Sequence, residues 1–346
     1  MKKIIFIICL LIINLSCNQN TKTKNIITVK SEKKMYDINK FIFPEAKDIT
    51  ENNFVEKLSS QIKHYEKEPI YYFRINKQNC IIEIDVNDIS FYDDYKLSNL
   101  ITPVEVGNIL QSGKQTVTVK MYPVGNLLNE SWGKTDDKPM TELTENSEVS
   151  IEVISIDEKS PKRLNDEKEI TKITSPKEAA GKNYYEFSFT FNAEVPYQFE
   201  GWTKGQDLTK LDQDLVRKKA LEFYKMVGEI HISKDLNAWL KLYYPSNVRN
   251  MSFIYANNEY LKEVLTELRT DVTTYDFKME PIKDFKMNYM GNGKLLRLVT
   301  TSLDPDLRNG GALFLDYDDG GISVPGITLY LPEGRDLATQ GFMMWK

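Results

Sequence analysis

The spacing of apolar residues changes near residue 200, and this change constrains the fold more than any other feature of the sequence. Before it, apolar residues tend to occupy alternate positions, most clearly in YYEFSFTFNA at 184–193. After it, apolar residues recur at helical spacing, first along 209–229. A period of two is typical of strands with one buried face, and a period of 3.6 is typical of amphipathic helices. The chain is therefore expected to form a sheet region first and a helical region second.

Several strand patterns precede residue 200, and polar turns rather than helices separate them. They lie at 70–75, 80–86, 115–123, 148–156 and 184–193. This order favours an antiparallel β-sandwich. A short amphipathic helix is expected within 51–65, and the charged segment 157–183 is expected to be a long exposed hairpin loop.

Three helices and then further strands are expected after residue 200. The helices lie at 209–229, from the N-cap Ser233 to just before Pro245, and at 257–272. Five strands follow, at 285–290, 294–301, 312–317, 326–332 and 341–346. The turn Gly291-Asn292-Gly293 predicts a hairpin. The predicted class is α+β overall: an N-terminal antiparallel β-sandwich, then an α+β domain of helices and a curved antiparallel sheet. The element order over 209–346 loosely resembles NTF2-like or cystatin-like folds.

The first seventeen residues bear on where the protein is located. Lys2 and Lys3 precede an apolar run of ten residues at 4–13, and Ser16-Cys17 follows after a short break. The run is shorter than the roughly 20 residues that a membrane-spanning helix needs, and it suits the apolar part of a secretory signal. Together these features resemble a bacterial lipoprotein signal peptide, although Asn14 departs from the usual pattern. The other interpretation is a secretory signal without lipidation.

The lipoprotein resemblance implies a division of the chain and a location. Residues 1–16 would be removed as a signal peptide, and Cys17 would receive the lipid at the start of a flexible tether, 17–50. The sandwich with its short helix would occupy 51–203, and the α+β domain 204–346. The resemblance places the protein in the bacterial cell envelope. No acidic cluster follows Cys17, which favours the periplasmic face of the outer membrane.

Composition and charge exclude some partners and some covalent links. The chain has 346 residues and a formal charge of −5, which becomes −7 without residues 1–16 because these carry two lysines and no acid. An acidic body argues against a nucleic-acid partner. Only Cys80 remains in the folded part if Cys17 is lipidated, so we expect no intrachain disulfide. We interpret Cys80 as a small buried apolar residue.

The search for catalytic and metal-binding motifs yields only weak candidates. The sequence lacks the G-x-S-x-G, H-E-x-x-H and C-x-x-C patterns, and the two histidines, His64 and His231, fall in different predicted domains. Asp316, Asp318 and Asp319 lie in an acidic stretch that could bind calcium. Tight turns need the same residues, and we favour that interpretation. We therefore expect neither a metal nor a cofactor.

Aromatic residues provide the candidate binding site. The stretch VPYQFEGW at 195–202 places Tyr197, Phe199 and Trp202 at the predicted domain junction. If these side chains are exposed, they could bind a sugar or a peptide. The alternative, which we favour, is that they fill the junction between the two domains.

Taken together, the sequence favours a membrane-anchored, non-catalytic periplasmic lipoprotein that binds another protein. An immunity lipoprotein, which holds a toxin inactive in the periplasm, is one concrete form. Two alternatives stay open. One is a lipoprotein that binds a small ligand in a pocket behind 209–270. The other is a hydrolase that uses carboxylates which the sequence does not single out.

Overall fold

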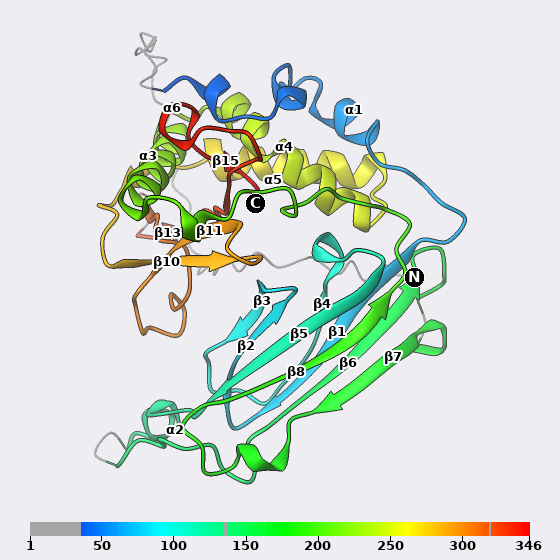
Figure 1. The fold of residues 1–346 in the computed structure, drawn as a ribbon, viewed down its shortest axis with the longest axis vertical. Coiled ribbons are helices and arrows are strands. Elements are labelled where there is room, and N and C mark those ends of the chain that lie inside the picture. The colour runs from blue at the N-terminus through cyan, green and yellow to red at the C-terminus, as the bar shows by residue number, and fades with distance from the viewer. Residues whose placement is uncertain (1–35, 135–136, 163, 318–319) are drawn as a thin grey trace, which may run out of the picture. The chain divides into compact units, whose positions relative to one another are not determined.

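The computed structural model describes residues 36–134, 137–162, 164–317 and 320–346. The predicted signal peptide and Cys17 lie outside these ranges. Within them the chain from Tyr36 to Lys346 forms one compact unit. It combines several antiparallel sheets with three long helices that follow the N-terminal strands, so the predicted α+β class is confirmed (Figure 1).

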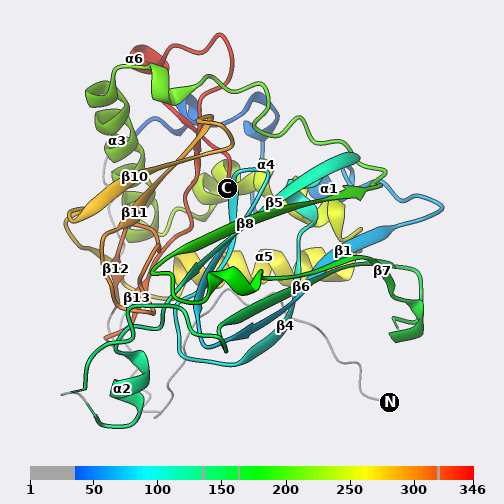
Figure 2. The same cartoon turned by 60° about the horizontal axis from the view of Figure 1, so that its bottom comes forward.

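Two four-stranded antiparallel sheets form the β-sandwich (Figures 1 and 2). Their strand orders are β4-β1-β6-β7 and β3-β2-β5-β8. The strands are β1 (Pro69–Gln78), β2 (Ile81–Val86), β3 (Ile89–Asp94), β4 (Leu100–Glu105), β5 (Gly113–Tyr122), β6 (Glu148–Asp157), β7 (Lys168–Thr174) and β8 (Tyr185–Ala193). Alternate residues of both sheets point inward, and Phe73, Ile84 and Val119 are fully buried there. We call this apolar cluster the sandwich core.

Three of these strands lie where the sequence shows no clear strand pattern. The expectation of a long exposed loop at 157–183 is wrong in part, because β7 lies within it. The sequence pattern does not predict β3 and β4 either. All three are edge strands, so little of each is buried and the alternation of apolar and polar residues is weak. Short elements in this half are η3 (Gly107–Ile109), α2 (Leu127–Ser131), η4 (Leu164–Asp166) and η5 (Lys177–Ala179).

Three consecutive helices follow the sandwich: α3 (Gln213–Ile232), α4 (Leu236–Phe253) and α5 (Asn258–Thr273), after η6 (Leu208–Lys210). The predicted limits of the second helix are wrong. Its N-cap is Asp235 rather than Ser233, and Pro245 lies inside it. An interior proline costs roughly 3 kcal/mol. The helix continues because burial of side chains on both sides of the proline, such as Trp239 and Phe253, outweighs that cost.

Small antiparallel sheets complete the C-terminal half. Their orders are β10-β11-β14-β15 and β13-β12-β9. The elements are β9 (Lys278–Met279), β10 (Phe285–Met290), β11 (Leu295–Thr300), β12 (Leu315–Asp316), β13 (Ile322–Ser323), β14 (Leu329–Tyr330), α6 (Leu337–Gln340) and β15 (Met343–Met344). The last three predicted strands are thus much shorter than expected. On β11, Leu296 and Leu298 join the cluster formed with the helices, which we call the helical core, while Leu295 joins the sandwich core.

The first described segment packs against the helices before the chain enters the sandwich. It contains η1 (Ile38–Lys40), η2 (Pro44–Ala46) and α1 (Phe54–Ser59). Ile42, Ala46, Phe54 and Leu58 are buried in the helical core. Arg269 of α5 donates from Nε to Glu51 at 2.7 Å. Residues 36–50, which the sequence assigns to a tether, are therefore part of the packed body. The helix expected within 51–65 is shorter than predicted and contributes to the helical core.

Candidate functional site

The three aromatic residues of the predicted junction site fill space between segments. Tyr197 and Trp202 have only 4% and 7% of their surface exposed, and Phe199 is half-buried. Tyr197 stacks on Phe199 with ring centroids 4.7 Å apart and donates from its hydroxyl to the Gly107 carbonyl oxygen at 3.0 Å. The ring of Trp202 meets that of Trp345 edge-on at 5.7 Å. This placement corresponds to the interpretation in which the aromatic residues fill the junction.

The other residues singled out from the sequence lie apart from one another. Asp316 lies in β12, and Asp318 and Asp319 fall outside the described residues. His231 is buried in the last turn of α3. Within the described ranges, no three His, Cys, Asp or Glu side chains gather as a metal site requires. Cys80 is buried, as predicted, and this burial raises the pKa of its thiol to about 12, which disfavours the reactive thiolate.

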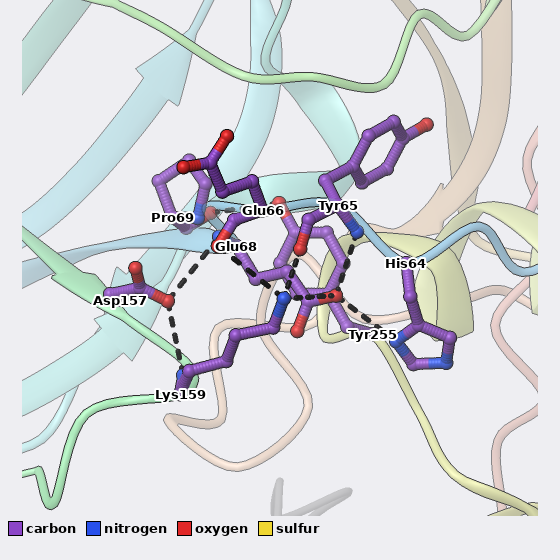
Figure 3. Close-up of polar contacts among 8 residues, drawn as sticks. All are labelled: His64, Tyr65, Glu66, Glu68, Pro69, Asp157, Lys159 and Tyr255. Carbon is purple, nitrogen blue, oxygen red and sulfur yellow. Dashed lines mark hydrogen bonds and ion pairs between the residues drawn. The ribbon is translucent and has the colours of Figure 1, made fainter.

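His64 belongs to a set of polar contacts around Glu68, which we call the Glu68 cluster (Figure 3). The Glu68 side chain is almost fully buried, and its Oε1 lies 3.0 Å from both His64 Nδ1 and the Tyr65 backbone nitrogen. Lys159 Nζ lies 3.6 Å from the same oxygen. The Glu68 backbone nitrogen donates to Asp157 Oδ1 at 3.3 Å. The buried carboxylate thus faces His64 and Tyr65 just before β1 and Lys159 just after β6.

The contacts of the Glu68 cluster bear on both its chemistry and its structural role. Figure 3 shows the second ring nitrogen of His64 pointing away from Glu68, and a carboxylate that orients an imidazole in this way is one part of a general-base arrangement. The Tyr255 hydroxyl donates to the Pro69 carbonyl oxygen at 3.2 Å. Burial, helped by the charge of Glu68, raises the pKa of Tyr255, so the hydroxyl keeps its proton. These contacts connect α4's C-terminal end, the N-terminal segment and the sandwich, which makes the cluster a joint between the two cores.

A polar cavity of about 650 Å³ lies between the sandwich and two turns of the C-terminal half; we call it the inter-turn pocket. Its lining includes Asp85, Thr118, Lys120 and Glu186 on the sheet, and Trp202 and Asn292 on the turns. The strands β2, β5 and β8 therefore supply one wall, and the segments 202–203 and the β10–β11 turn supply the other. Among the described cavities, this one combines acidic, basic and hydroxyl side chains.

The inter-turn pocket owes its shape to two hairpin turns that bind each other. Asn87 and Asp88, between β2 and β3, have φ values of 53° and 63°, which Asn and Asp tolerate better than most residues. The backbone nitrogens of Gly291 and Asn292 donate to the Asp88 carbonyl oxygen at 2.8 Å and to its Oδ2 at 2.7 Å. Two features require glycine at position 291: its φ is 60°, and a Cβ there would lie 2.6 Å from the Trp202 ring.

Two of the charges on the sheet wall of this pocket form an ion pair. Lys120 Nζ donates to Asp85 Oδ2 at 2.7 Å. Burial disfavours the charged amine, but the Asp85 carboxylate outweighs this effect and raises the pKa of Lys120. Thr118 Oγ1 lies 3.1 Å from Ser188 Oγ on the neighbouring strand. These contacts fix the orientation of the polar groups that face the cavity.

A half-exposed apolar surface runs between β7 and β8, the last strands of the two sandwich sheets; we call it the β7–β8 seam. Its members are Tyr185, Phe187 and Phe189 of β8 and Ile170 and Ile173 of β7, all half-buried. In the described part of the chain, each of these two strands is paired along one edge only. The seam therefore combines partly exposed aromatic rings with backbone groups of edge strands.

Comparisons of the chain with protein-family models, curated proteins and solved structures find no match. In the described part of the chain, no helix has both the length and the apolar character needed to cross a membrane. The functional proposals therefore depend on the chain's own residues.

Sequence reasoning missed the inter-turn pocket, although it identified one of its turns. The hairpin at Gly291-Asn292-Gly293 is predicted and confirmed, because β10 and β11 pair antiparallel on either side of it. Its partner Asp88 lies 204 positions from Asn292 along the chain, and no local pattern relates the two. The available signal was Asn87-Asp88, a pair that favours a tight hairpin turn.

Proposed function

We propose that this chain is a lipoprotein of the bacterial cell envelope, anchored through Cys17, whose body binds another protein without catalysing a reaction. The sequence of residues 1–17 supports the anchor, and the lack of acidic residues after Cys17 favours the periplasmic face of the outer membrane. An immunity-type lipoprotein that holds a toxin inactive is one form of this function. Two or three acyl chains on Cys17 would hold the body at the membrane, since each buried CH₂ contributes about 0.8 kcal/mol.

The observation that carries the protein-binding part is the β7–β8 seam. Edge strands in natural proteins are usually protected by charges, prolines or bulges because an unpaired edge accepts a further strand. β4 contains Pro103, and β7 carries Lys168 and Lys172. β8 spans nine residues and contains neither lysine nor proline. Its half-buried aromatic side chains are also of the kind that protein interfaces favour.

The β8 edge suits a partner that adds an extended segment beside it. Backbone hydrogen bonds to β8 would supply affinity, and contacts with Phe187 and Phe189 would supply selectivity. The outward residues of β8 are mostly neutral, such as Ser188 and Thr190, so they would not repel a partner of either charge. The proposed partner is therefore a protein with an exposed strand or an extended loop.

Membrane fractionation tests the anchor. We expect the wild-type chain to partition with membranes and to incorporate labelled fatty acid, and Cys17→Ser to do neither. A Cys9→Ser variant controls for the loss of a thiol in the same region. Equal membrane retention of the Cys17→Ser variant would refute the proposed anchor.

In-cell photo-crosslinking tests the partner surface. A photoreactive residue at Ser188 is expected to capture a defined protein, while the same residue at the exposed Thr266 of α5 captures little. Ser188→Lys combined with Thr190→Lys places charges on the β8 edge and should abolish capture of that protein by affinity purification. Thr266→Lys is the matched control. Capture that survives the charged β8 edge would rule out this surface.

A further inference from the structure

The inter-turn pocket is held in shape before any ligand binds. Asp88 fixes the β10–β11 turn through two backbone donors, and Asn87 Oδ1 accepts from the Thr116 backbone nitrogen at 3.0 Å. The Asn87 side-chain amide also donates to Gln115 Oε1 at 2.8 Å. A preformed cavity loses less free energy on binding than one whose walls must first be ordered.

The polar groups that face the cavity are mixed in type and close to balanced in charge. The lining has three acids, Asp85, Asp88 and Glu186, and two amines, Lys114 and Lys120. Asp85 and Lys120 neutralise each other at 2.7 Å. A strongly charged ligand of either sign would therefore meet a repelling group of its own sign nearby. An apolar ligand would leave these groups without hydrogen-bond partners, which is costly.

The same cavity is lined by both hydrogen-bond donors and acceptors. Carboxylates accept only, ammonium groups donate only, and the Thr116 hydroxyl and the Asn292 amide do both. A ligand whose own groups both donate and accept satisfies such a lining best, and a hydroxyl has this property.

We propose that the inter-turn pocket binds a neutral, hydroxyl-rich ligand of the carbohydrate class. A cavity of about 650 Å³ has room for a unit of one to a few sugar rings. The pocket and the β7–β8 seam share strand β8, because Glu186 lines the pocket and pocket residue Thr118 lies 3.1 Å from Ser188 Oγ. They lie on opposite faces of that strand, since Phe187 and Phe189 of the seam alternate with Glu186 and Ser188. Sugar binding is therefore tested with Thr116 and Asn292, neither of which belongs to the seam.

The test uses the full chain purified from membranes in a detergent without a sugar head group. Neutral oligosaccharides built from glucose, galactose, mannose, xylose or N-acetylglucosamine are titrated by calorimetry and by saturation-transfer NMR. One of these series is expected to bind at a single site. Thr116→Val removes a hydroxyl from the pocket, and Asn292→Gly removes an amide while keeping a residue that tolerates a φ of 57°. Each should weaken binding about three- to tenfold, the effect of one lost neutral hydrogen bond.

Matched controls separate pocket binding from binding elsewhere. Thr174→Val makes the same change at an exposed position of β7 in the other sheet and should leave the affinity unchanged. The proposal is overturned if no neutral oligosaccharide binds at millimolar concentration. Equal affinity for the Thr116→Val, Asn292→Gly and Thr174→Val variants would also overturn it, since the ligand would then bind outside the pocket. Preferential binding of a charged compound that competes at this site would refute the ligand class.

Discussion

In the described part of the chain, the buried charged side chains, Glu68 and Lys77, lie in or beside the sandwich, whereas the buried polar side chains of the helical half are uncharged ones and His231. In the helical core, the Tyr224 hydroxyl donates to the Ile327 carbonyl oxygen at 2.9 Å and accepts from the Leu298 nitrogen at 2.8 Å. In the sandwich, the fully buried Lys77 pairs with Asp94 at 2.7 Å. Around Glu68, a buried carboxylate again meets charged or chargeable partners.

This difference indicates how each region is held together. Neutral groups bonded to backbone atoms keep their partners over a wide range of pH and salt concentration. A buried ion pair is more easily disrupted, because loss of one partner leaves an uncompensated charge. We therefore expect the sandwich to depend on charged residues, and the helical core to depend on neutral hydrogen bonds and apolar packing.

Lys77→Met is the most damaging change that we predict. It leaves Asp94 without its cation, and it removes the bond from Lys77 Nζ to the Lys96 carbonyl oxygen at 2.8 Å. The expected loss in free energy of unfolding is about 3–5 kcal/mol, measured by denaturant or thermal melts. Adding Asp94→Asn should recover part of the loss because the stranded charge is removed. Exposed Lys114→Met is the control, and equal stability of both single variants would contradict the role of the buried pair.

Glu68→Gln tests the joint between the two cores. The amide keeps one acceptor oxygen but loses the charge that faces Lys159 and His64. We expect a loss of about 2–3 kcal/mol in the free energy of unfolding. Glu66→Gln, at an exposed neighbouring position, should change stability by less than about 0.5 kcal/mol. A Glu68→Gln chain as stable as the Glu66→Gln control would show that the cluster does not join the cores.

Tyr224→Phe tests the neutral arrangement of the helical core. It leaves the Ile327 carbonyl oxygen and the Leu298 nitrogen without their shared partner, so we expect a loss of about 1–2 kcal/mol. The loss should be the same at about pH 6 and about pH 8, because burial keeps the pKa of Tyr224 raised, to about 12. Tyr184→Phe, on the surface, provides the comparison. A loss that varies with pH in this range would break the proposed contrast.

His231 gives the helical core one source of acid sensitivity. Burial lowers its pKa below the ordinary value, so on acidification the unfolded chain takes up a proton before the folded chain does. Its contribution is fully present above the ordinary pKa and is lost as the pH falls below it, by up to about 1.4 kcal/mol per pH unit. Thermal melts of wild type and His231→Phe below about pH 6.5 should differ in slope, with the variant less sensitive. Parallel slopes would show that His231 does not titrate on unfolding.

The elements that could be predicted from the sequence are those whose local pattern matches their burial. β8 alternates apolar and polar residues, and α5 has an apolar stripe between the N-cap Asn257 and its end, so both are predicted nearly to their bounds. β4 and β7 have weak patterns because half of each edge strand faces solvent. The continuation of α4 through Pro245 depends on packing from other segments, which local propensity does not report.

The candidate sites were harder to predict than the elements. Tyr197 and Trp202 were identified as aromatic residues of the junction, but only the fold shows that they are buried there. The inter-turn pocket and the Glu68 cluster each need groups that lie far apart along the chain. Asp88 and Asn292 are separated by 204 positions, and Glu68 and Asp157 by 89. This proximity follows from the topology of the fold, and the spacing of residues within one segment does not predict it.

The packing of residues 36–62 against the helices has a consequence for the order of folding. Glu51 bonds to Arg269, which lies 218 positions later, so this segment cannot reach its final place until α5 exists. Contacts between residues so far apart in sequence slow folding, because the entropy cost of closing the chain comes before the contacts form. Until then Phe54 and Leu58 have no apolar cover. We therefore expect the two cores to form before the N-terminal segment closes over one of them.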